Sequence, residues 1–375
     1  MIQKLLPEVC HIQYGFPFDS KRFSNKEGTP LIRIRDVVRG YTETFTTEQC
    51  SDDYIVKKGD ILIGMDGMFN VAKWNGNTAY LNQRVCKLEP KSSIVANYLF
   101  YYLPCALKKI ENKTAFVTVK HLKAKQLNSI LIPYPSIKEQ EKIAQTLDLL
   151  FRLIYKKKKQ LNSLDELVKS RFLELFGELW VNDKGFPCYS VGQVAESVTY
   201  GTSDPASNSG QYEYLRMNNL TDNGQLDLSD LKRIDMSDDQ AEKYMAKKGD
   251  ILFNRTNSID LVGKTALFNL DTPMIIAGYL IRIRLSDKVN PVYFTAYMNM
   301  PYMKEKLRNM AKGAVNQANI NSKELKSIQI LIPPLSLQNE YCNFVLSIDK
   351  SKMAVQKSLD ELETLKKSLM QTYFG

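Results

Sequence analysis

The fold of this chain is decided by residues 133–177, which read PYPSIKEQEKIAQTLDLLFRLIYKKKKQLNSLDELVKSRFLELFG. After Pro135 the stretch contains no proline, and its only glycine is the last residue. Positions 147, 150, 154, 157, 161, 164, 168, 171 and 175 read Leu, Leu, Ile, Lys, Leu, Leu, Val, Arg and Leu. This alternating spacing of three and four is typical of the apolar seam of a coiled coil. The stretch therefore predicts one helix of about 35 to 40 residues, roughly 50 to 60 Å long.

A second copy of this stretch follows at a constant offset of 198 residues. The string PYPSIKEQ at 133–140 aligns with LIPPLSLQ at 331–338, and Phe176-Gly177 aligns with Phe374-Gly375. The second stripe, from 345 to 373, reads Val, Ile, Lys, Val, Leu, Leu, Lys, Leu and Tyr. Because a long helix cannot bury such a stripe alone, we expect the two copies to pack on each other as an antiparallel coiled coil. The alternative is that each helix packs onto the globular domain of its own half.

The regions before the two helices are related more loosely. KKGDIL occurs at 57–62 and again at 247–252, an offset of 190, and Tyr14-Gly15 resembles Tyr200-Gly201. Alternating runs predict strands at 30–35, 61–63, 84–88, 251–253 and 280–285, with KKGD as the turn before two of them. Amphipathic helices are predicted at 97–110 and 291–310.

We therefore predict an α+β fold with two mixed α/β domains in a pseudo-twofold repeat, separated by two long helices that form an antiparallel coiled coil. The expected borders are 1–136 for the first domain, 137–178 for the first helix, 179–334 for the second domain and 335–375 for the second helix.

Composition narrows the class of partner. The 375 residues carry a formal net charge of +10, which indicates a polyanionic partner, either nucleic acid or an anionic membrane surface. No apolar run reaches the length of a membrane span and no secretory leader is visible, so we expect no membrane partner and a cytoplasmic protein. The six cysteines form no CxxC pair, as expected for free thiols in a reducing compartment. A basic protein without a polyanionic partner is the alternative.

The motifs that resemble catalytic signatures are incomplete. Gly263-Lys264-Thr265 resembles the end of a phosphate-binding loop, but Ser258 stands where that loop needs glycine. Asn290-Pro291 is better explained as the cap of the next helix than as part of a methyltransferase motif. The two histidines, His11 and His121, have no metal-ligand spacing with the cysteines. We expect no catalytic residue, no cofactor and no metal.

Binding chemistry remains, because arginine, asparagine and glutamine can bond base edges while lysine mostly serves phosphates. The arginines at 33, 35 and 39 crowd a predicted strand and the turn after it, and position 216 lies in the comparable place at an offset of 183. The candidate DNA-contacting residues are Arg33, Arg35, Arg39, Lys73, Arg84, Lys120, Arg216, Asn218, Asn219, Arg255, Asn257, Asn316, Gln317 and Asn319. For each of them an ordinary solvated surface is the alternative.

The doubled KKGDIL, the doubled proline–glutamine segment and the doubled helix ending in LFG and YFG occur in the same order in both halves. In this respect the whole chain resembles the specificity subunit of type I restriction–modification enzymes. The resemblance implies that each domain reads one half of a split, asymmetric sequence in double-stranded DNA and that the helices act as a ruler. It also implies two methyltransferase subunits and, in the full enzyme, restriction subunits as partners, which perform adenine methylation and cleavage.

Two other classes of protein remain open on sequence alone. One is a detached specificity half of a fused methyltransferase–nuclease, against which the missing catalytic motifs count. The other is a coiled-coil scaffold that binds no DNA, against which the charge of +10 and the arginine-rich strands count.

Overall fold

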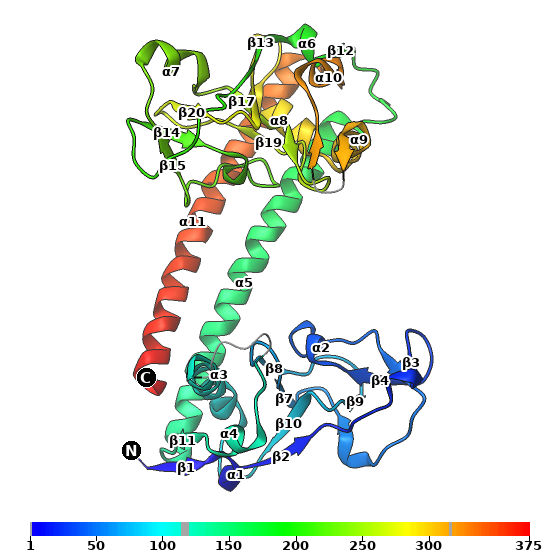
Figure 1. Cartoon of the computed structure of the whole chain (residues 1–375), viewed down its shortest axis with the longest axis vertical. Coiled ribbons are helices and arrows are strands. Elements are labelled where there is room, and N and C mark those ends of the chain that lie inside the picture. Colours follow the sequence, from blue (N-terminus) through cyan, green and yellow to red (C-terminus); the bar gives the residue numbers. More distant parts are fainter. Residues whose placement is uncertain (1, 114–119, 315–316) are drawn as a thin grey trace. The chain divides into compact units, whose positions relative to one another are not determined.

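The computed structural model describes residues 2–113, 120–314 and 317–375, and it contains two compact units. Unit 1 comprises the chain up to Lys159 together with Gln356–Gly375, and unit 2 comprises Gln160–Val355. Each unit therefore contains part of both long helices (Figure 1). The four-part division at residues 136, 178 and 334 stays a prediction.

Unit 1 contains a four-stranded sheet, a five-stranded sheet and a two-stranded sheet. Its strands are β1 (Gln3–Leu5), β2 (Cys10–Tyr14), β3 (Phe23–Ser24), β4 (Thr29–Ile32), β5 (Phe45–Thr46), β6 (Ile55–Val56), β7 (Ile61–Gly64), β8 (Val71–Lys73), β9 (Ala79–Leu81), β10 (Val85–Pro90) and β11 (Leu131–Pro133). Its helices are α1 (Leu6–Val9), α2 (Ile34–Arg39), α3 (Ala96–Lys113), α4 (Ala124–Asn128) and the start of α5 (Ile137–Phe176). One sheet has the order β2-β10-β7-β8 and the other β3-β5-β4-β9-β6, while β1 pairs with β11.

Unit 2 repeats this plan. Its strands are β12 (Cys188–Ser190), β13 (Ala195–Tyr200), β14 (Tyr212–Leu215), β15 (Lys232–Ile234), β16 (Met245–Ala246), β17 (Ile251–Asn254), β18 (Thr256–Asn257), β19 (Thr265–Leu267), β20 (Met274–Ile276), β21 (Leu280–Leu285), β22 (Lys312–Ala314), β23 (Gln317–Asn319) and β24 (Gln329–Leu331). Its helices are α6 (Val191–Val194), α7 (Asp238–Tyr244), α8 (Pro291–Asn299), α9 (Pro301–Met310), α10 (Ser322–Ser327) and the start of α11 (Leu335–Phe374). The sheet β13-β21-β17-β19 corresponds to β2-β10-β7-β8, and the parallel pair β14 and β20 corresponds to β4 and β9.

The doubled KKGD string forms the same tight turn in both units, as predicted. The N–H of Lys57 donates to Oδ2 of Asp60 at 2.8 Å, and the N–H of Lys247 donates to Oδ2 of Asp250 at 2.8 Å. The glycine between them has φ of +97° at position 59 and +95° at position 249, a conformation that other residues rarely adopt. The turn leads directly into β7 in unit 1 and β17 in unit 2.

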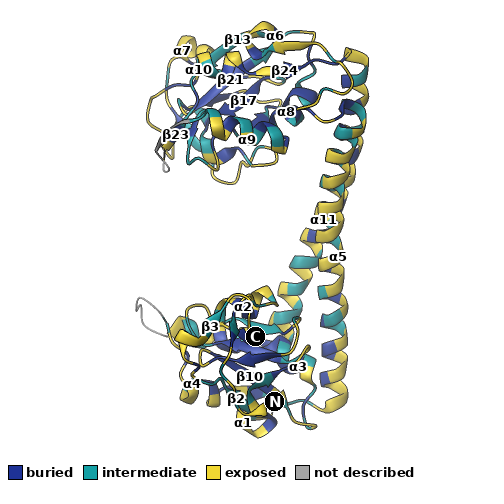
Figure 2. Cartoon of the chain, turned by 90° about the vertical axis from the view of Figure 1, so that its right-hand side faces the viewer, coloured by how far each residue is buried: buried dark blue, intermediate teal, exposed yellow. Residues whose placement is uncertain are grey.

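The predicted seam of the two long helices is confirmed. Every stripe position on α5 and α11 is buried or half-buried, whereas Leu149, Tyr155 and Met353, which lie off the stripe, are 56%, 67% and 74% exposed. Figure 2 shows the exposed outer faces of both helices in yellow and the sheets of each unit in dark blue.

Contacts between the helices show that they run antiparallel in each unit. In unit 1, Lys158 pairs with Glu363 at 3.0 Å, and Lys366 lies 5.1 Å from the ring centre of Phe151. In unit 2, Asp165 pairs with Lys352 at 2.5 Å and Arg171 with Glu340 at 2.5 Å. Residue numbers fall on one helix as they rise on the other, and the charged stripe positions 171, 352 and 366 have partners across the seam. The two helices therefore pack on each other, as we expected, and the alternative that each packs only onto its own domain is wrong.

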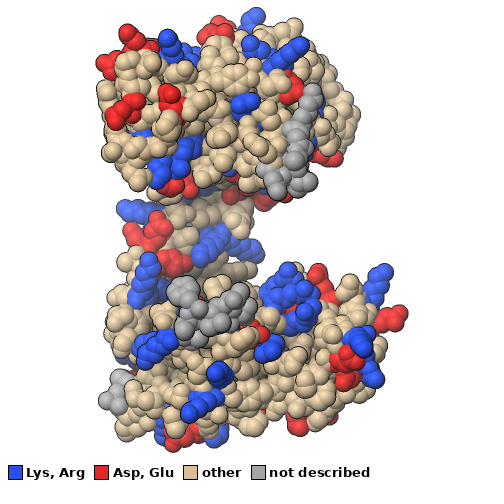
Figure 3. All heavy atoms as spheres, in the orientation of Figure 1, with Lys and Arg blue, Asp and Glu red and all other residues tan. Residues whose placement is uncertain are grey.

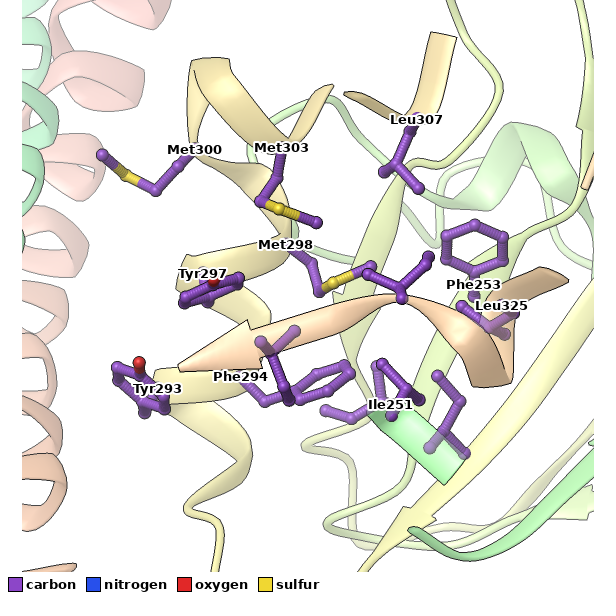
Figure 4. Close-up of a cluster of buried hydrophobic side chains, with 14 of the residues drawn as sticks. Ile251, Phe253, Tyr293, Phe294, Tyr297, Met298, Met300, Met303, Leu307 and Leu325 are labelled. Atoms are coloured by element: carbon purple, nitrogen blue, oxygen red, sulfur yellow. The ribbon is translucent and has the colours of Figure 1, made fainter. Parts of the chain in front are cut away.

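Each long helix ends in an aromatic socket. The ring of Phe374, at the end of α11, lies 5.5 Å from Tyr98 and 5.6 Å from Tyr102 on α3. The ring of Phe176, at the end of α5, lies 4.7 Å from Tyr293 on α8 in the core of unit 2. In that core, the side chains of β17, such as Phe253, pack against those of α8 and α9 (Figure 4). The doubled LFG and YFG motifs thus anchor each helix at its far end.

A buried glutamine anchors the near end of each helix. Gln140 on α5 accepts from the N–H of Val95 at 2.9 Å and donates to the carbonyl of Pro135 at 3.0 Å. Gln338 on α11 accepts from the N–H of Asn290 at 2.8 Å and donates to the carbonyls of Lys288 and Pro333. Both glutamine residues are fully buried, so each fixes the start of its helix to the strand-to-helix connection beside it.

Two expectations about elements were wrong in detail. The run 30–35 is a strand only to Ile32, because Arg33 caps α2 and Asp36 closes the capping box. The helix expected over 291–310 is two helices, α8 and α9, because Pro301 has no N–H to continue the first. The cap at Asn290 was predicted correctly, since its Oδ1 accepts from the N–H of Val292 at 2.9 Å.

Candidate nucleic-acid interface

Three distant segments of unit 1 meet at the end of β7. The N–H of Met65 donates to the carbonyl of Arg84 at 3.0 Å, and its carbonyl accepts from the N–H of Leu122 at 2.7 Å. On this backbone frame the carboxylate of Asp66 lies 2.6 Å from Nδ1 of His121 and 3.5 Å from Nε of Arg84. The side chain of Arg84 is 57% exposed, so a guanidinium oriented by a carboxylate faces solvent here.

Unit 2 builds the same frame with different side chains. The N–H of Arg255 donates to the carbonyl of Tyr279 at 3.0 Å, and its carbonyl accepts from the N–H of Ile320 at 2.9 Å. Thr256 follows, and its Oγ1 lies 3.0 Å from Oδ1 of Asn319. The carboxylate–imidazole pair of unit 1 is thus replaced by a hydroxyl–amide pair, and the arginine moves from one strand end to another.

A pocket of about 460 Å³ lies beside this frame in unit 2. It brings together three of the predicted residues, Arg216, Asn218 and Arg255, with Asp204 and Tyr279 also in its lining. These residues come from four separate loops at strand ends, so the convergence is a property of the sheet order and not of sequence proximity.

The arginine-rich segment 33–39 lies at the end of β4. The N–H of Arg33 donates to Oδ2 of Asp36 at 2.9 Å, as the N–H of Arg216 donates to Oδ1 of Asn219 at 2.8 Å. The offset of 183 residues therefore holds in the structure. Arg33, Arg35 and Arg39 are exposed, but the latter two lie on α2 and not on a strand, because the capping box starts a helix there.

Several predicted residues have bonds that hold the fold. Lys73 donates to Oδ1 of Asn97 at 2.5 Å, and Lys120 donates to the carbonyl of Glu111 at 2.8 Å. Asn219 is 2% exposed, and its amide donates to the carbonyl of Asp227 at 2.8 Å, so we propose no DNA contact for it.

The remaining predicted residues lie on or beside a small sheet in unit 2. Asn257 and Asn319 are half-buried on paired strands β18 and β23, and Gln317 is exposed on β23. Asn316 lies outside the described residues. The sequence did not single out Asp66, Tyr279 or Asp204; the position of Asp66 directly after a strand launched by the doubled KKGD turn was the available signal.

Lysine and arginine side chains occur over both units on the face that Figure 3 shows, interspersed with acidic ones. Lys264 of the incomplete phosphate-loop string donates to the carbonyls of Met217 and Leu220, at 3.2 and 2.6 Å, and burial lowers its pKa. Its ammonium group is therefore occupied within the fold.

The described part of the chain carries no metal cluster and no disulfide. No group of three or more His, Cys, Asp or Glu side chains in it is placed to hold a metal ion. The six cysteines are free thiols, of which Cys188 is exposed, and burial raises the pKa of Cys10 and Cys86 to about 12. Among the helices of residues 2–113, 120–314 and 317–375, none is both long and apolar enough to cross a membrane.

Comparison with known proteins connects this geometry to a family. The family model for the type I restriction modification DNA specificity domain matches twice, at residues 3–166 and 184–364. The chain is 30% identical to the type I restriction enzyme EcoBI specificity subunit of Escherichia coli, over 98% of this chain and 84% of that protein. It is 25% identical to the MjaVIII specificity subunit of Methanocaldococcus jannaschii, over 91% and 87% of the two chains.

Solved structures share the fold. A type I restriction–modification S subunit from M. genitalium aligns with a TM-score of 0.61 at 14% identity, covering 100% of this chain and 96% of that one. A chain from a study of complex assembly and conformational transition of the type I R-M system aligns with a TM-score of 0.54 at 16% identity, covering 100% and 97%. With two matched domains that span most of its length, the chain belongs to the type I restriction–modification DNA specificity family.

Proposed function

We propose that this chain is the DNA-specificity subunit of a type I restriction–modification enzyme and that its two halves each read one half of a bipartite, asymmetric target in double-stranded DNA. One observation carries the proposal: the same backbone frame at the end of β7 and β17 presents Asp66, Arg84 and His121 in unit 1 but Thr256, Tyr279 and Asn319 in unit 2. Different donor and acceptor sets on equal frames are suited to reading different base edges.

The proposed contacts are the predicted residues that are exposed or half-buried at the strand ends of each unit. In unit 1 they are Arg33, Arg35, Arg39 and Arg84, supported by Asp66 and His121. In unit 2 they are Arg216, Asn218, Arg255, Asn257, Gln317 and Asn319. Arginine and amide side chains can each form paired hydrogen bonds to guanine or adenine in the major groove.

The long helices set the distance between the half-sites in this proposal. Each helix is anchored at its start by a buried glutamine and at its end by a phenylalanine, so its length is fixed between two rigid attachments. Helix length is then the quantity that determines the unspecified gap in the target.

The chain acts as a non-catalytic part of a larger enzyme. The relatives are named as subunits of type I restriction enzymes, and one aligned chain comes from a study of complex assembly. We propose two methyltransferase subunits and, for cleavage, restriction subunits as partners, acting on DNA in the cytoplasm. Methyl transfer to adenine and strand cleavage belong to those partners.

Mapping adenine methylation in a host that expresses this chain with its methyltransferase subunit tests the proposal. We expect one motif made of two specified halves separated by an unspecified gap, with centres roughly one helical turn apart. The control is the same host with the methyltransferase subunit alone, which should show no such motif. A continuous motif without a gap, or no motif, would refute the bipartite reading.

A further inference from the structure

The bonding of Arg255 sets it apart from Arg216 and Arg284, two other arginines of unit 2. Arg216 donates to Asp230 at 2.7 Å, and Arg284 donates to Asp250 at 2.9 Å. Arg255 instead lies over the ring of Tyr200, 4.9 Å from its centre, and no described residue accepts a hydrogen bond from its guanidinium. Its Nε is buried without a partner, as are those of Arg171, Arg216 and Arg282, and Arg216 lines the same pocket as Arg255. Buried polar groups without a partner are uncommon in folded proteins.

This arginine lines the 460 Å³ pocket, whose walls differ in exposure. Thr202, Tyr214 and Ala277 are buried and form its inner part, whereas Asp204 and Asn218 are exposed. Arg255 is half-buried, and its Nε is shielded from solvent where the guanidinium lies over Tyr200.

One backbone donor lies in the same lining. Gly278 and Tyr279 form the turn between β20 and β21, and Ala277 before them bridges Thr202 in parallel, as Asn82 bridges Phe16 at the equivalent turn of unit 1. In unit 1 that bridge contains the bond from the N–H of Gln83 to the carbonyl of Phe16 at 3.0 Å, so the corresponding Gly278 is engaged with Thr202. The N–H of Tyr279 donates to no backbone carbonyl of the described residues, and such an N–H can donate to an anion.

The shape of the pocket decides which part of DNA it can accept. Base edges lie at the bottom of the grooves and are reached by side chains that project, whereas phosphates stand out along the backbone and enter hollows. Asp204, a carboxylate of the lining, accepts from Oγ1 of Thr202 at 2.7 Å. Within the described residues it forms no ion pair with Arg255, so it does not neutralise that positive charge.

We infer that the pocket bounded by Arg255, Gly278 and Tyr279 holds one backbone phosphate of the target duplex. Arg255 is then a residue that positions the second half of the chain on DNA, while the exposed side chains around the pocket contact bases. This inference rests on the proposed function, because it takes the bound polyanion to be DNA.

The test measures how duplex binding depends on salt. Fluorescence anisotropy would follow binding of the full chain, in complex with its methyltransferase subunit, to a duplex that carries its mapped motif and to one with a changed second half-site. The variants are Arg255→Gln, which removes the charge at similar size, and Arg255→Lys, which keeps it. Arg308→Ala is the matched control, since Arg308 is an exposed arginine of unit 2 outside the pocket.

Loss of one phosphate contact should lower the slope of log affinity against log salt by about 0.9, so that the loss of affinity between about 50 and 200 mM salt becomes about 3.5-fold smaller. For Arg255→Gln we expect this lower salt slope, together with an equal loss of affinity on both duplexes and an unchanged methylated motif. Arg255→Lys and Arg308→Ala should keep the wild-type slope. An unchanged slope, or a motif relaxed at one base of the second half-site, would overturn the inference while wild-type binding stands. Failure of the wild-type complex to bind its motif would instead refute the proposed function and the inference together.

Discussion

The two units carry the same backbone hydrogen bonds at the end of β7 and β17 but present different chemistry there. In unit 1 a carboxylate pairs with His121 and orients Arg84; in unit 2 a hydroxyl lies against Asn319 and the arginine sits at position 255. Because both frames are closed by main-chain bonds, side chains at these positions can change without loss of the fold. The difference indicates that recognition is carried by exchangeable side chains on a constant frame.

The helix attachments show the opposite behaviour. Gln140 and Gln338 make corresponding bonds to the start of the neighbouring helix, and Phe374 and Phe176 contact corresponding tyrosines. Burial raises the pKa of Tyr98 and Tyr293, whose hydroxyls donate to the carbonyls of Pro133 and Leu331. The contacts that attach the helices to the domains are therefore closely repeated, whereas the side chains proposed to contact DNA differ between the units.

Breaking the helix seam should have the largest effect. Two residues inserted after Asn162 rotate the following stripe by about 200°, which turns Leu164 away from α11 while Leu150 still faces it. We expect loss of the cooperative thermal transition and of assembly with the methyltransferase subunit, measured by calorimetry and size-exclusion chromatography. Two residues inserted after Asn182, beyond the end of α5, are the control; equal damage from both would contradict the role of the seam.

Lengthening both helices together should change the spacing between the two half-sites without unfolding the protein. Four residues inserted after Asn162 and four after Gln356 add about 6 Å and slightly more than one turn to each helix, which keeps both stripes nearly in phase. Since DNA rises about 3.4 Å per base pair, the gap in the methylated motif should grow by one or two base pairs with both halves unchanged. Methylation mapping gives the result, and an active complex with an unchanged gap would refute the ruler.

Removal of either glutamine anchor should lower the free energy of unfolding, and the size of the loss should differ between the two. Gln338→Ala leaves the N–H of Asn290 and two carbonyls unpaired, and Gln140→Ala leaves the N–H of Val95 and one carbonyl unpaired. We expect each to cost about 2 kcal/mol or more in free energy of unfolding, with the larger loss for Gln338. Scanning calorimetry of the full chain checks this, with the exposed Lys138→Ala as control; a shift no larger than that of the control would count against the anchors.

Charge reversal in one unit should have the smallest and most selective effect. Arg33→Glu places a carboxylate at an exposed position of unit 1, where the guanidinium lies 5.9 Å from the ring centre of Phe23. We expect altered or lost methylation at sites defined by the first half of the motif, an unchanged second half and normal stability. Equal relaxation of both halves in the methylation map would show that the reading is not divided between the units.

The repeated, local features were predictable from sequence. The stripe predicted both helices, and proline, glycine and asparagine marked their limits and the cap at Asn290. The strand predicted over 30–35 was too long. The alternation of apolar and basic residues continues into α2, where the bond from the N–H of Arg33 to Asp36 starts a helix. An arginine at a helix cap carries no sequence signal of its own, so the capping carboxylate was the only available indication.

The site was predictable as a set of residue types but not as an arrangement. Arg216 and Arg255 meet in one pocket because β14 and β20 pair in parallel and β17 lies beside β21, an order set by long-range packing. Asn219 and Lys73 looked equally suitable in sequence, yet their polar atoms are used by neighbouring segments. Burial and bond partners, which depend on the whole domain, separate these two groups.

The central claim is that two interchangeable heads on one frame read two half-sites. The most direct test is a chain in which residues 179–334 are replaced by a copy of residues 1–136, expressed with the methyltransferase subunit, followed by adenine-methylation mapping. Because the repeated helices run antiparallel, two identical heads should read the first half-site twice in inverted order, giving a palindromic motif with an unspecified gap. A motif that keeps the original second half, or that is not palindromic, would contradict the account.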